Sequence, residues 1–183
     1  MARLPYLNRE DLAEENKDLL NRVINLTRLL VHNPDAARAF HGVGNYIRFK
    51  SKLDPRLREL AILMVGWLER SPFEWSHHVK IGHDFGVSDE DIKGLIAEAS
   101  GQPSTLDARA KLVLKAAREI TRDLGTSDTT FAELKRNFPN DEIVDLVLTT
   151  AFYNAVVRVL ATFQIDVEPE YQPYLDKFPL PKN

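Results

Sequence analysis

The residues best suited to proton transfer lie in one short segment, RSPFEWSHHVKIGHDFGVS (residues 70–88), which contains three of the chain's five histidines. If this segment is helical after Pro72, Glu74 and His78 lie one turn apart on the same face, about 40° from each other around the axis. His83 then lies about 140° from His78, on the solvent side. His83 therefore does not share a face with His78, and the Glu74–His78 pair is the candidate for proton transfer.

A second carboxyl residue, Glu59, precedes an uncharged stretch in RLRELAILMVGW. At helical spacing Glu59 shares a face with Leu63 and Gly66, which predicts close packing. If the helices on either side of ERSP form a hairpin, Glu59 approaches Glu74 and His78. Burial and like charge raise a carboxyl pKa, and a carboxylate raises the pKa of a neighbouring imidazole. Such a site can exchange protons near neutral pH, as general acid–base catalysis requires.

Other interpretations of these residues stay open at this point. A Glu–His pair at this spacing also occurs as a structural ion pair at a surface or interface. A metal site needs a further ligand that Glu-x-x-x-His does not supply, so no metal site is predicted. His77 fits a surface or subunit-interface position, Trp75 fits the core as well as a pocket lining, and His41 is a possible pocket neighbour.

Composition excludes several classes of function. The net charge of −3 gives no reason to expect a nucleic acid or an anionic membrane as partner. Cysteine is absent, which excludes disulfides, thiolate nucleophiles and iron–sulfur clusters. The N-terminal residues lack the apolar core of a signal peptide, and the apolar stretch LAILMVGWL is about half of a membrane span. A cytoplasmic location is predicted.

The chain must position these residues on helices, because nearly every segment has apolar residues at helical period. No convincing strand pair occurs, which predicts an all-α, single-domain helical bundle over residues 1–183. Gly86 and Gly125 are the expected left-handed residues behind two of the helices. The tail from Asp166 is rich in proline and is expected to be extended. The predicted helices cover residues 8–32, 33–50, 53–70, 72–85, 88–99, 106–125, 128–138 and 140–165.

A weak internal repeat relates LDPRLRELAIL (residues 53–63) to LDARAKLVLKA (residues 106–116). The later segments DEDIKGLI and NDEIVDLVL follow at a similar offset, which suggests a duplicated helical unit. The second copy has Leu112 where the first has Glu59, and it has no counterpart of the histidines. A polar group in only one copy is easier to explain by function than by packing.

The blocks LDPRLRELAIL, ERSPFEWSHHVKIGHDFGVSDEDI and AFYNAVVRVL together resemble the carboxymuconolactone decarboxylase family, which shares its fold with alkylhydroperoxidase D. The resemblance covers residues 33–167 and is most specific over residues 56–92. It leaves an N-terminal helix (8–32) and a proline-rich tail (168–183) as extensions. It implies an all-helical fold with an internal repeat, assembled as trimers or hexamers.

In the peroxidase branch of this fold, a glutamate precedes a Cys-x-x-Cys-x-x-x-His motif. Here Ser71 and Glu74 stand at the two cysteine positions, His78 matches the histidine, and Glu59 matches the upstream glutamate. Peroxide reduction by that thiol chemistry is excluded, because the chain has no cysteine. The resemblance instead implies a lyase-like acid–base site built from Glu59, Glu74 and His78, as in the branch without redox cysteines.

The reaction implied by the resemblance is decarboxylation of a small carboxylated lactone or related acid, without a metal or an organic cofactor. His78, held by Glu74, would protonate the dienolate on carbon, and Glu59 would reload it. Replacing His78 or Glu59 with glutamine is expected to abolish turnover with little loss of stability. Residues predicted to contact the substrate, including cations for its carboxylate, are His77, Arg56, Arg58 and Trp75.

Two alternatives keep the same scaffold. An isomerase, hydratase or lactone hydrolase would use the same residue types. A non-catalytic, oligomeric small-molecule-binding protein would keep the pocket without the chemistry. A cavity that contains the three site residues favours an enzyme, whereas a site filled by side chains counts against both.

Overall fold

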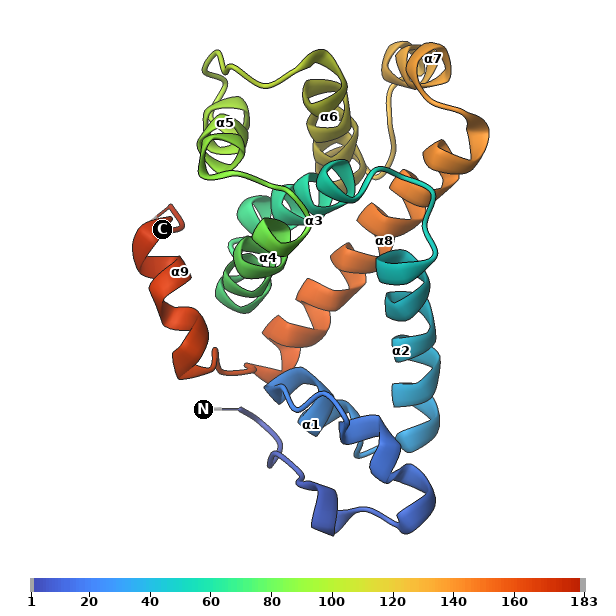
Figure 1. Cartoon of the computed structure of the whole chain (residues 1–183), viewed down its shortest axis with the longest axis vertical. Helices are drawn as coiled ribbons and strands as arrows, with labels where there is room; N and C mark the ends of the chain where they lie inside the picture. Colours follow the sequence, from blue (N-terminus) through green and yellow to red (C-terminus); the bar gives the residue numbers. More distant parts are fainter. Residues whose placement is uncertain (1, 182–183) are drawn as a thin grey trace.

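The computed structural model describes residues 2–181, and in this range the protein consists of helices without any strand (Figure 1). The all-α prediction is therefore confirmed. The elements in chain order are η1 (Arg9–Asp11), η2 (Glu14–Leu20), α1 (Asn25–Leu30), α2 (Pro34–Phe49), α3 (Pro55–Leu68), α4 (Pro72–Asp84), α5 (Asp89–Ala99), α6 (Ala108–Asp123), α7 (Asp128–Asn137), α8 (Asn140–Phe163), η3 (Pro169–Tyr171) and α9 (Gln172–Lys177), where η denotes a short 3-10 helix.

Short polar residues followed by proline start the helices that build the site. Asn33, Asp54 and Ser71 cap α2, α3 and α4, and each side chain accepts a hydrogen bond from a backbone N–H of the first turn. Proline follows at the first helical position, where its fixed φ and missing N–H carry no penalty. These local signals explain why the predicted starts of the three helices agree with the structure.

Two residues with positive φ lie behind α4 and α6. Gly86 has φ +91° after α4, as the sequence predicts. After α6 the left-handed residue is Leu124, with φ +72°, and not Gly125 as expected. Leu124 is also the most exposed large apolar side chain of the described chain, at 95%.

Helix α3 lies at the centre of the fold and packs against α4, α5, α6 and α8. Ten consecutive residues of α3, from Leu57 to Gly66, are buried. The largest apolar cluster joins this helix to α4, α5 and α6. The helices that begin the two predicted repeats, α3 and α6, are both capped by aspartate and pack directly on each other.

Helix α8 is the longest element and crosses behind α3 and α6 (Figure 1). By length and composition it is the one helix in residues 2–181 that could span a membrane. Its packing against α3 and α6 identifies it as a core helix of the fold. One stripe of α8 remains exposed, at Val144, Val147 and Leu148.

The N-terminal region is not one helix over residues 8–32, and that prediction is wrong. It forms η1, η2 and α1, separated by non-helical turns (Figure 1). The breaks let Leu19 and Leu20 fold back and bury against Val31 and Ala37. Polar side chains also bond to this backbone, as where Arg9 donates to the Lys17 carbonyl, and such bonds compete with a continuous helix.

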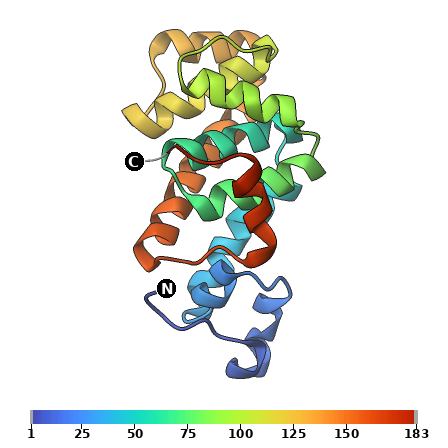
Figure 2. The same cartoon turned by 90° about the vertical axis from the view of Figure 1, so that its left-hand side faces the viewer.

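The C-terminal segment is also more ordered than expected, since it forms η3 and α9. Helix α9 lies across α4 (Figure 2). The indole of Trp75 donates to the carbonyl of Phe178 at 2.7 Å, and Phe178 is itself buried. The N-terminal segment meets the segment that follows α8, where the Tyr6 hydroxyl lies 3.0 Å from an Asp166 carboxylate oxygen.

Candidate active site

A cavity of about 380 Å³ lies between α2, α4, α8 and the segment that joins η2 to α1. Its size is within the range of small-molecule sites. Its walls combine aromatic rings with titratable side chains, among them Arg22, Phe40, His41, Arg48, Glu59, Phe73, Glu74, His77, His78, Phe152 and Tyr153.

His78 lies between two carboxylates in this cavity. Its Nδ1 is 2.7 Å from Oε2 of Glu59, which comes from α3, and its Nε2 is 3.0 Å from Oε1 of Glu74, one turn earlier in α4. All three side chains are buried. The hairpin of α3 and α4 can close this tightly because Gly66 leaves room for the backbone of Trp75, to which a Cβ at position 66 would come within 3.3 Å.

The carboxylate of Glu59 is anchored on its other side by Arg58. The guanidinium donates from Nη2 at 2.9 Å and from Nε at 3.1 Å to Oε1 of Glu59. It also lies over the ring of Phe85, 4.6 Å from the centroid, and donates to the carbonyl of Arg48. Arg58 therefore supplies the countercharge and fixed orientation that a buried carboxylate needs.

The two carboxylates determine the charge of His78. Burial alone would lower the pKa of the imidazole, but the charges of Glu74 and Glu59 outweigh it and raise the pKa to about 9. Burial alone would raise the pKa of Glu59, but the charges of His78 and Arg58 hold it below its ordinary value. At neutral pH the site thus contains an imidazolium paired with an ionised Glu59.

Glu74 lies on the side of the His78 ring opposite Glu59, and it lines the cavity. Its Oε1 is close enough to His78 for an ion pair but has no hydrogen-bond partner of good geometry among the described residues. The Tyr153 ring packs edge-on against His78, with centroids 4.9 Å apart. Burial, followed by the charges of Glu74 and Glu59, raises the pKa of Tyr153 well above its ordinary value, so the phenol stays protonated.

His77 lines the cavity and is buried, which departs from the surface position that the sequence favoured. Its ring is stacked between Phe73 and Tyr171, with centroid distances of 4.0 Å and 3.5 Å. Its Nε2 lies 2.8 Å from Oε2 of Glu168. Burial lowers the pKa of this imidazole despite the nearby Glu168. His77 therefore connects the C-terminal segment to the cavity wall.

The other predicted substrate contacts do not line the cavity. Arg56 is held by Asp91 and Asp107, with its Nε 2.9 Å from Oδ2 of Asp91, and these bonds turn it away from α4. Arg58 is occupied by Glu59. Trp75, on α4, is fully buried and donates to the carbonyl of Phe178. Ser71, at the position of the first cysteine of the peroxidase motif, acts as the N-cap of α4.

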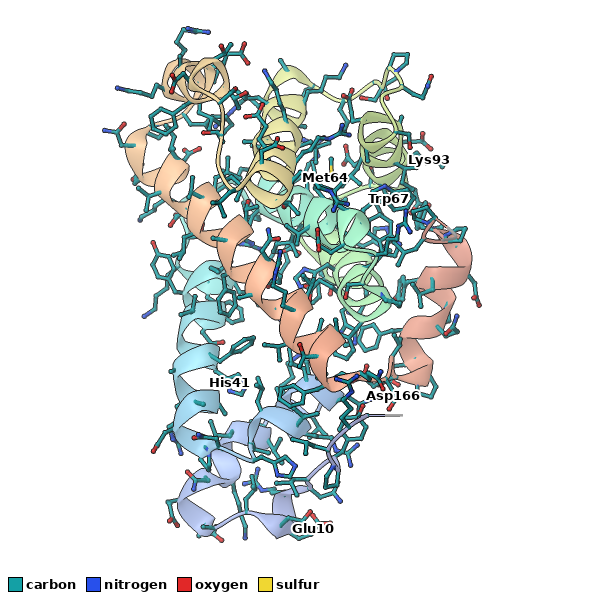
Figure 3. All side chains as sticks on the ribbon, turned by 180° about the vertical axis from the view of Figure 1, so that it is seen from behind. Glu10, His41, Met64, Trp67, Lys93 and Asp166 are labelled. Atoms are coloured by element: carbon teal, nitrogen blue, oxygen red, sulfur yellow. The ribbon has the colours of Figure 1, made fainter. Side chains whose placement is uncertain are left out.

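Most residues of the cavity wall that faces the α3–α4 hairpin were not predicted from the sequence. Arg22, Arg48, Phe40 and Phe152 were not predicted to line a pocket, and His41 was named only as a possible neighbour. His41 and Arg48 are seven residues apart and so lie on one face of α2. This spacing is the signal that could have identified them. Figure 3 shows His41 on the side of α2 turned toward α8.

Residues 2–181 contain no group of three or more acidic, histidine or cysteine side chains arranged to hold a metal ion. Both ring nitrogens of His78 face carboxylates, and Nε2 of His77 faces Glu168.

Solved structures with the same fold have low sequence identity to this chain. An uncharacterized peroxidase-related protein from Ralstonia eutropha JMP134, described as an alkylhydroperoxidase AhpD core, is 19% identical, with 95% of each chain covered and a TM-score of 0.76. A peroxidase-related protein from Silicibacter sp. TM1040 is 21% identical over 86% of this chain and 83% of that one, with a TM-score of 0.67. The debrominase Bmp8 is 16% identical over 94% and 95%, with a TM-score of 0.75.

At these identities the structures show a common fold and no more. No curated protein gives a significant match to the chain. The sequence profile of the carboxymuconolactone decarboxylase family matches residues 34–119, which include Glu59, Glu74 and His78. Over this region the chain, which has no cysteine, matches the carboxymuconolactone decarboxylase family, and its fold is that of the AhpD-like proteins.

Proposed function

We propose that this protein is a cofactor-free acid–base enzyme that decarboxylates a small carboxylated lactone or a related acid. The observation that supports it best is the position of His78, which is paired with Glu59 and Glu74 beside a cavity large enough for such a substrate. The family match over residues 34–119 agrees with this chemistry.

In the proposed reaction the substrate loses CO2, and the electron pair of the broken C–C bond moves into the conjugated carbonyl as a dienolate. A proton is then added to carbon, so that one carboxylate and one proton give one CO2 and a neutral C–H product. Of Glu59, Glu74 and His78, only Glu74 has a buried carboxylate oxygen without a hydrogen-bond partner in the described chain, so we assign it the proton transfer to carbon. His78 supplies that proton to Glu74, and Glu59 with Arg58 stabilises the imidazolium between turnovers.

The names of the structural neighbours suggest other reactions that this chain is not equipped to perform in the same way. A second debrominase structure is of a cysteine-to-alanine variant in complex with 2,3,4-tribromopyrrole. This chain has no cysteine, so a thiol-dependent peroxidase or debrominase reaction has no nucleophile here. The acidic pair around His78 supports proton transfer instead.

The test is incubation of the protein with carboxymuconolactone and related carboxylated lactones in D2O. We expect release of CO2 together with one deuterium on carbon, followed by NMR. Deuterium exchange without CO2 would instead identify an isomerase on the same site. A thermal shift on ligand addition with neither CO2 nor exchange would identify a binding protein, and it would contradict the proposal.

The matched variants are Glu74→Gln and Glu10→Gln. The first should lower turnover by about a hundredfold or more, because it removes the acid–base group. The second changes an exposed glutamate in η1, outside the cavity, and should keep full activity. Equal turnover in the two variants would contradict the assignment of Glu74.

A further inference from the structure

We propose that Arg48, with Arg22 beside it, forms a subsite for a substrate carboxylate on the α2 wall of the cavity. This inference rests on the proposed function for the identity of the ligand as an organic acid. It assigns binding to residues that lie outside the Glu59–His78–Glu74 group, and binding can be measured without turnover.

Arg48 is a cation without a direct ion-pair partner among residues 2–181; the charge of Glu59 attracts it, but Glu59 is already paired with Arg58 and His78. It lines the cavity, and no hydrogen bond or ion pair joins its guanidinium to another residue in the range 2–181. Its Nε is buried and unpartnered. Two other arginines of this region are paired, since Arg58 binds Glu59 and Arg38 binds Asp18. A half-buried, unpaired charge is unfavourable by itself, and an anionic ligand would compensate it.

The guanidinium of Arg48 is oriented by its neighbours although it is not ion-paired. It lies over the rings of Phe49 and Phe85, at 5.6 Å and 5.7 Å from their centroids. The backbone carbonyl of Arg48 accepts a hydrogen bond from Arg58. The subsite is therefore fixed next to the Arg58–Glu59 pair, and a bound acid would reach both the cation and the acid–base residues.

Arg22, an exposed residue of the segment between η2 and α1, adds a second cation to the cavity lining opposite α2, and no ion pair joins it to another residue in the range 2–181. Burial, followed by the charge of Arg22, lowers the pKa of the Arg48 guanidinium and of the His41 imidazole. His41 is therefore neutral, and its buried Nε2 has no partner in the described chain. Two cations repel each other across the cavity, and a carboxylate would turn that repulsion into attraction.

The space beside these cations suits a flat, small acid. Gly44 lies on the same face of α2 as His41 and Arg48, and a Cβ there would meet no atom nearer than Phe152 Cε1, at 3.9 Å. Phe40 and Phe152 pack on each other beside it, with centroids 4.9 Å apart. Apolar rings next to an arginine pair fit a ring compound that carries a carboxylate.

The carboxylate held here is one that the product retains. A cation that pairs with the departing carboxylate would stabilise the ground state and slow the loss of CO2. A cation that pairs with a second acid group holds the substrate in place without opposing the reaction. Together with the proposed decarboxylation, this subsite predicts a substrate with at least two carboxylates, of which one remains after the reaction.

The test measures binding of benzoate, phthalate and 2-furoate by calorimetry, with benzamide as the uncharged comparison. We expect the wild-type protein to bind at least one of these acids and to bind benzamide more weakly than benzoate. Arg48→Gln should weaken acid binding by about tenfold to a hundredfold, as loss of a charged hydrogen bond predicts, and should leave benzamide binding unchanged. Arg48→Lys should be intermediate, because it keeps the charge and loses the planar pair of donors.

The control variant is Arg136→Gln, at an exposed arginine of α7 outside the cavity, which should bind like the wild type. Thermal unfolding checks the fold, and Arg48→Gln should melt at the same temperature as the wild type or higher because it removes an unpaired, half-buried charge. Equal acid binding by Arg48→Gln and the wild type would overturn the subsite. So would a failure of the wild type to bind any of the three acids, or tighter binding of inorganic phosphate than of all three.

The two proposals can fail separately. Glu74→Gln should lose turnover and keep acid binding, whereas Arg48→Gln should lose acid binding whether or not the chemistry is correctly assigned. Acid binding that depends on Arg48 in a protein without decarboxylase activity would overturn the function and leave the subsite intact.

Discussion

His78 has both ring nitrogens directed at carboxylates, and this arrangement decides its protonation and its role. An imidazole paired with Glu59 and Glu74 keeps its proton at neutral pH. The same pairing makes Glu59 structurally important, because the buried Arg58 has its carboxylate partner there. The sequence suggested that glutamine at Glu59 or His78 would cost little stability, but burial of the whole group changes that expectation.

Glu59→Gln should destabilise the fold by about 3 kcal/mol, because it leaves buried Arg58 and His78 without their shared carboxylate. Chemical denaturation measures this change, and Glu10→Gln, at an exposed site, should stay within about 0.5 kcal/mol of the wild type. A loss for Glu59→Gln no larger than that of the control would contradict the structural role.

The stability of the protein should depend on pH through His78. Its pKa is about 9 in the folded state against an ordinary 6.5, so its contribution is complete below about pH 6.5 and is lost as pH rises through 9. Glu59 acts in the opposite sense: its pKa is lowered from 4.5, so its contribution is present above that pH and is lost as pH falls through the lowered value.

The melting temperature of the wild type should therefore fall between pH 7 and pH 10, and that of His78→Gln should fall less over the same range. Parallel curves for the two proteins in a pH series of thermal unfolding would contradict the raised pKa.

At the scale of single elements, the sequence predicted best the features whose signal lies within a few residues, such as the starts of helices. The capped, proline-started helices α2, α3 and α4 were predicted at their observed starts, because cap and helix lie within a few residues of each other. The approach of Glu59 to His78 also follows locally, from one helical hairpin. Residues 8–32 were misassigned because helical spacing does not report that Leu19 and Leu20 fold back onto α2.

The cavity wall opposite the hairpin could not be predicted for a related reason. Arg48 and Tyr153 reach the cavity only after α2 and α8 have packed beside α4. The spacing of Arg48 from His41 places the two on one face of α2, but it does not show which element that face will meet. Arg56 was predicted to contact the substrate because it is close in sequence to Glu59. In the structure it forms ion pairs with Asp91 and Asp107, which are distant in sequence.

Gly66 sets the separation of α3 and α4, and this yields a prediction for the hairpin. Gly66→Ala would place a Cβ 3.3 Å from the backbone nitrogen of Trp75, which cannot move without shifting α4. We expect a loss of about 1–3 kcal/mol in stability and weaker pairing of Glu59 with His78.

Gly42→Ala on α2 is the matched control, since a Cβ there meets no atom within 4 Å, and it should be neutral or stabilising by up to about 1 kcal/mol. Denaturant unfolding of both variants checks the pair. Equal stability would show that α3 and α4 tolerate the added methyl group.

At the scale of the whole molecule, the exposed stripe of α8 groups three apolar side chains on one side of a helix. Val144 is 62% exposed, and Val147 and Leu148 lie on the same side of the helix. Tyr46, bonded to Asp145 at 2.8 Å, brings the exposed end of α2 next to this stripe. We propose that it contacts further copies of the chain in a trimer or hexamer, as the family resemblance implies.

Light scattering coupled to size exclusion tests the assembly. We expect a trimer or hexamer for the wild type and a smaller species for the double variant Val147→Glu, Leu148→Glu, because two buried carboxylates would oppose association. Val23→Glu, which is exposed outside α8, should keep the wild-type mass. A monomeric wild type would contradict the proposal.

The cavity is lined partly by residues within the region that matches the family and partly by residues outside it. Glu59, Glu74 and His78 lie within residues 34–119, the part that matches the family, whereas Arg22, Leu26 and Tyr153 lie outside it, and Glu168 and Tyr171 brace His77 from the C-terminal side. The matched region therefore contains the proton-transfer group and Arg48, whereas segments outside it complete the wall. Exchanging the ends of the chain would change the shape of the cavity and leave the proton-transfer group in place. Chimeras that exchange only residues 2–33 or 164–181 between relatives offer a route to new substrate ranges.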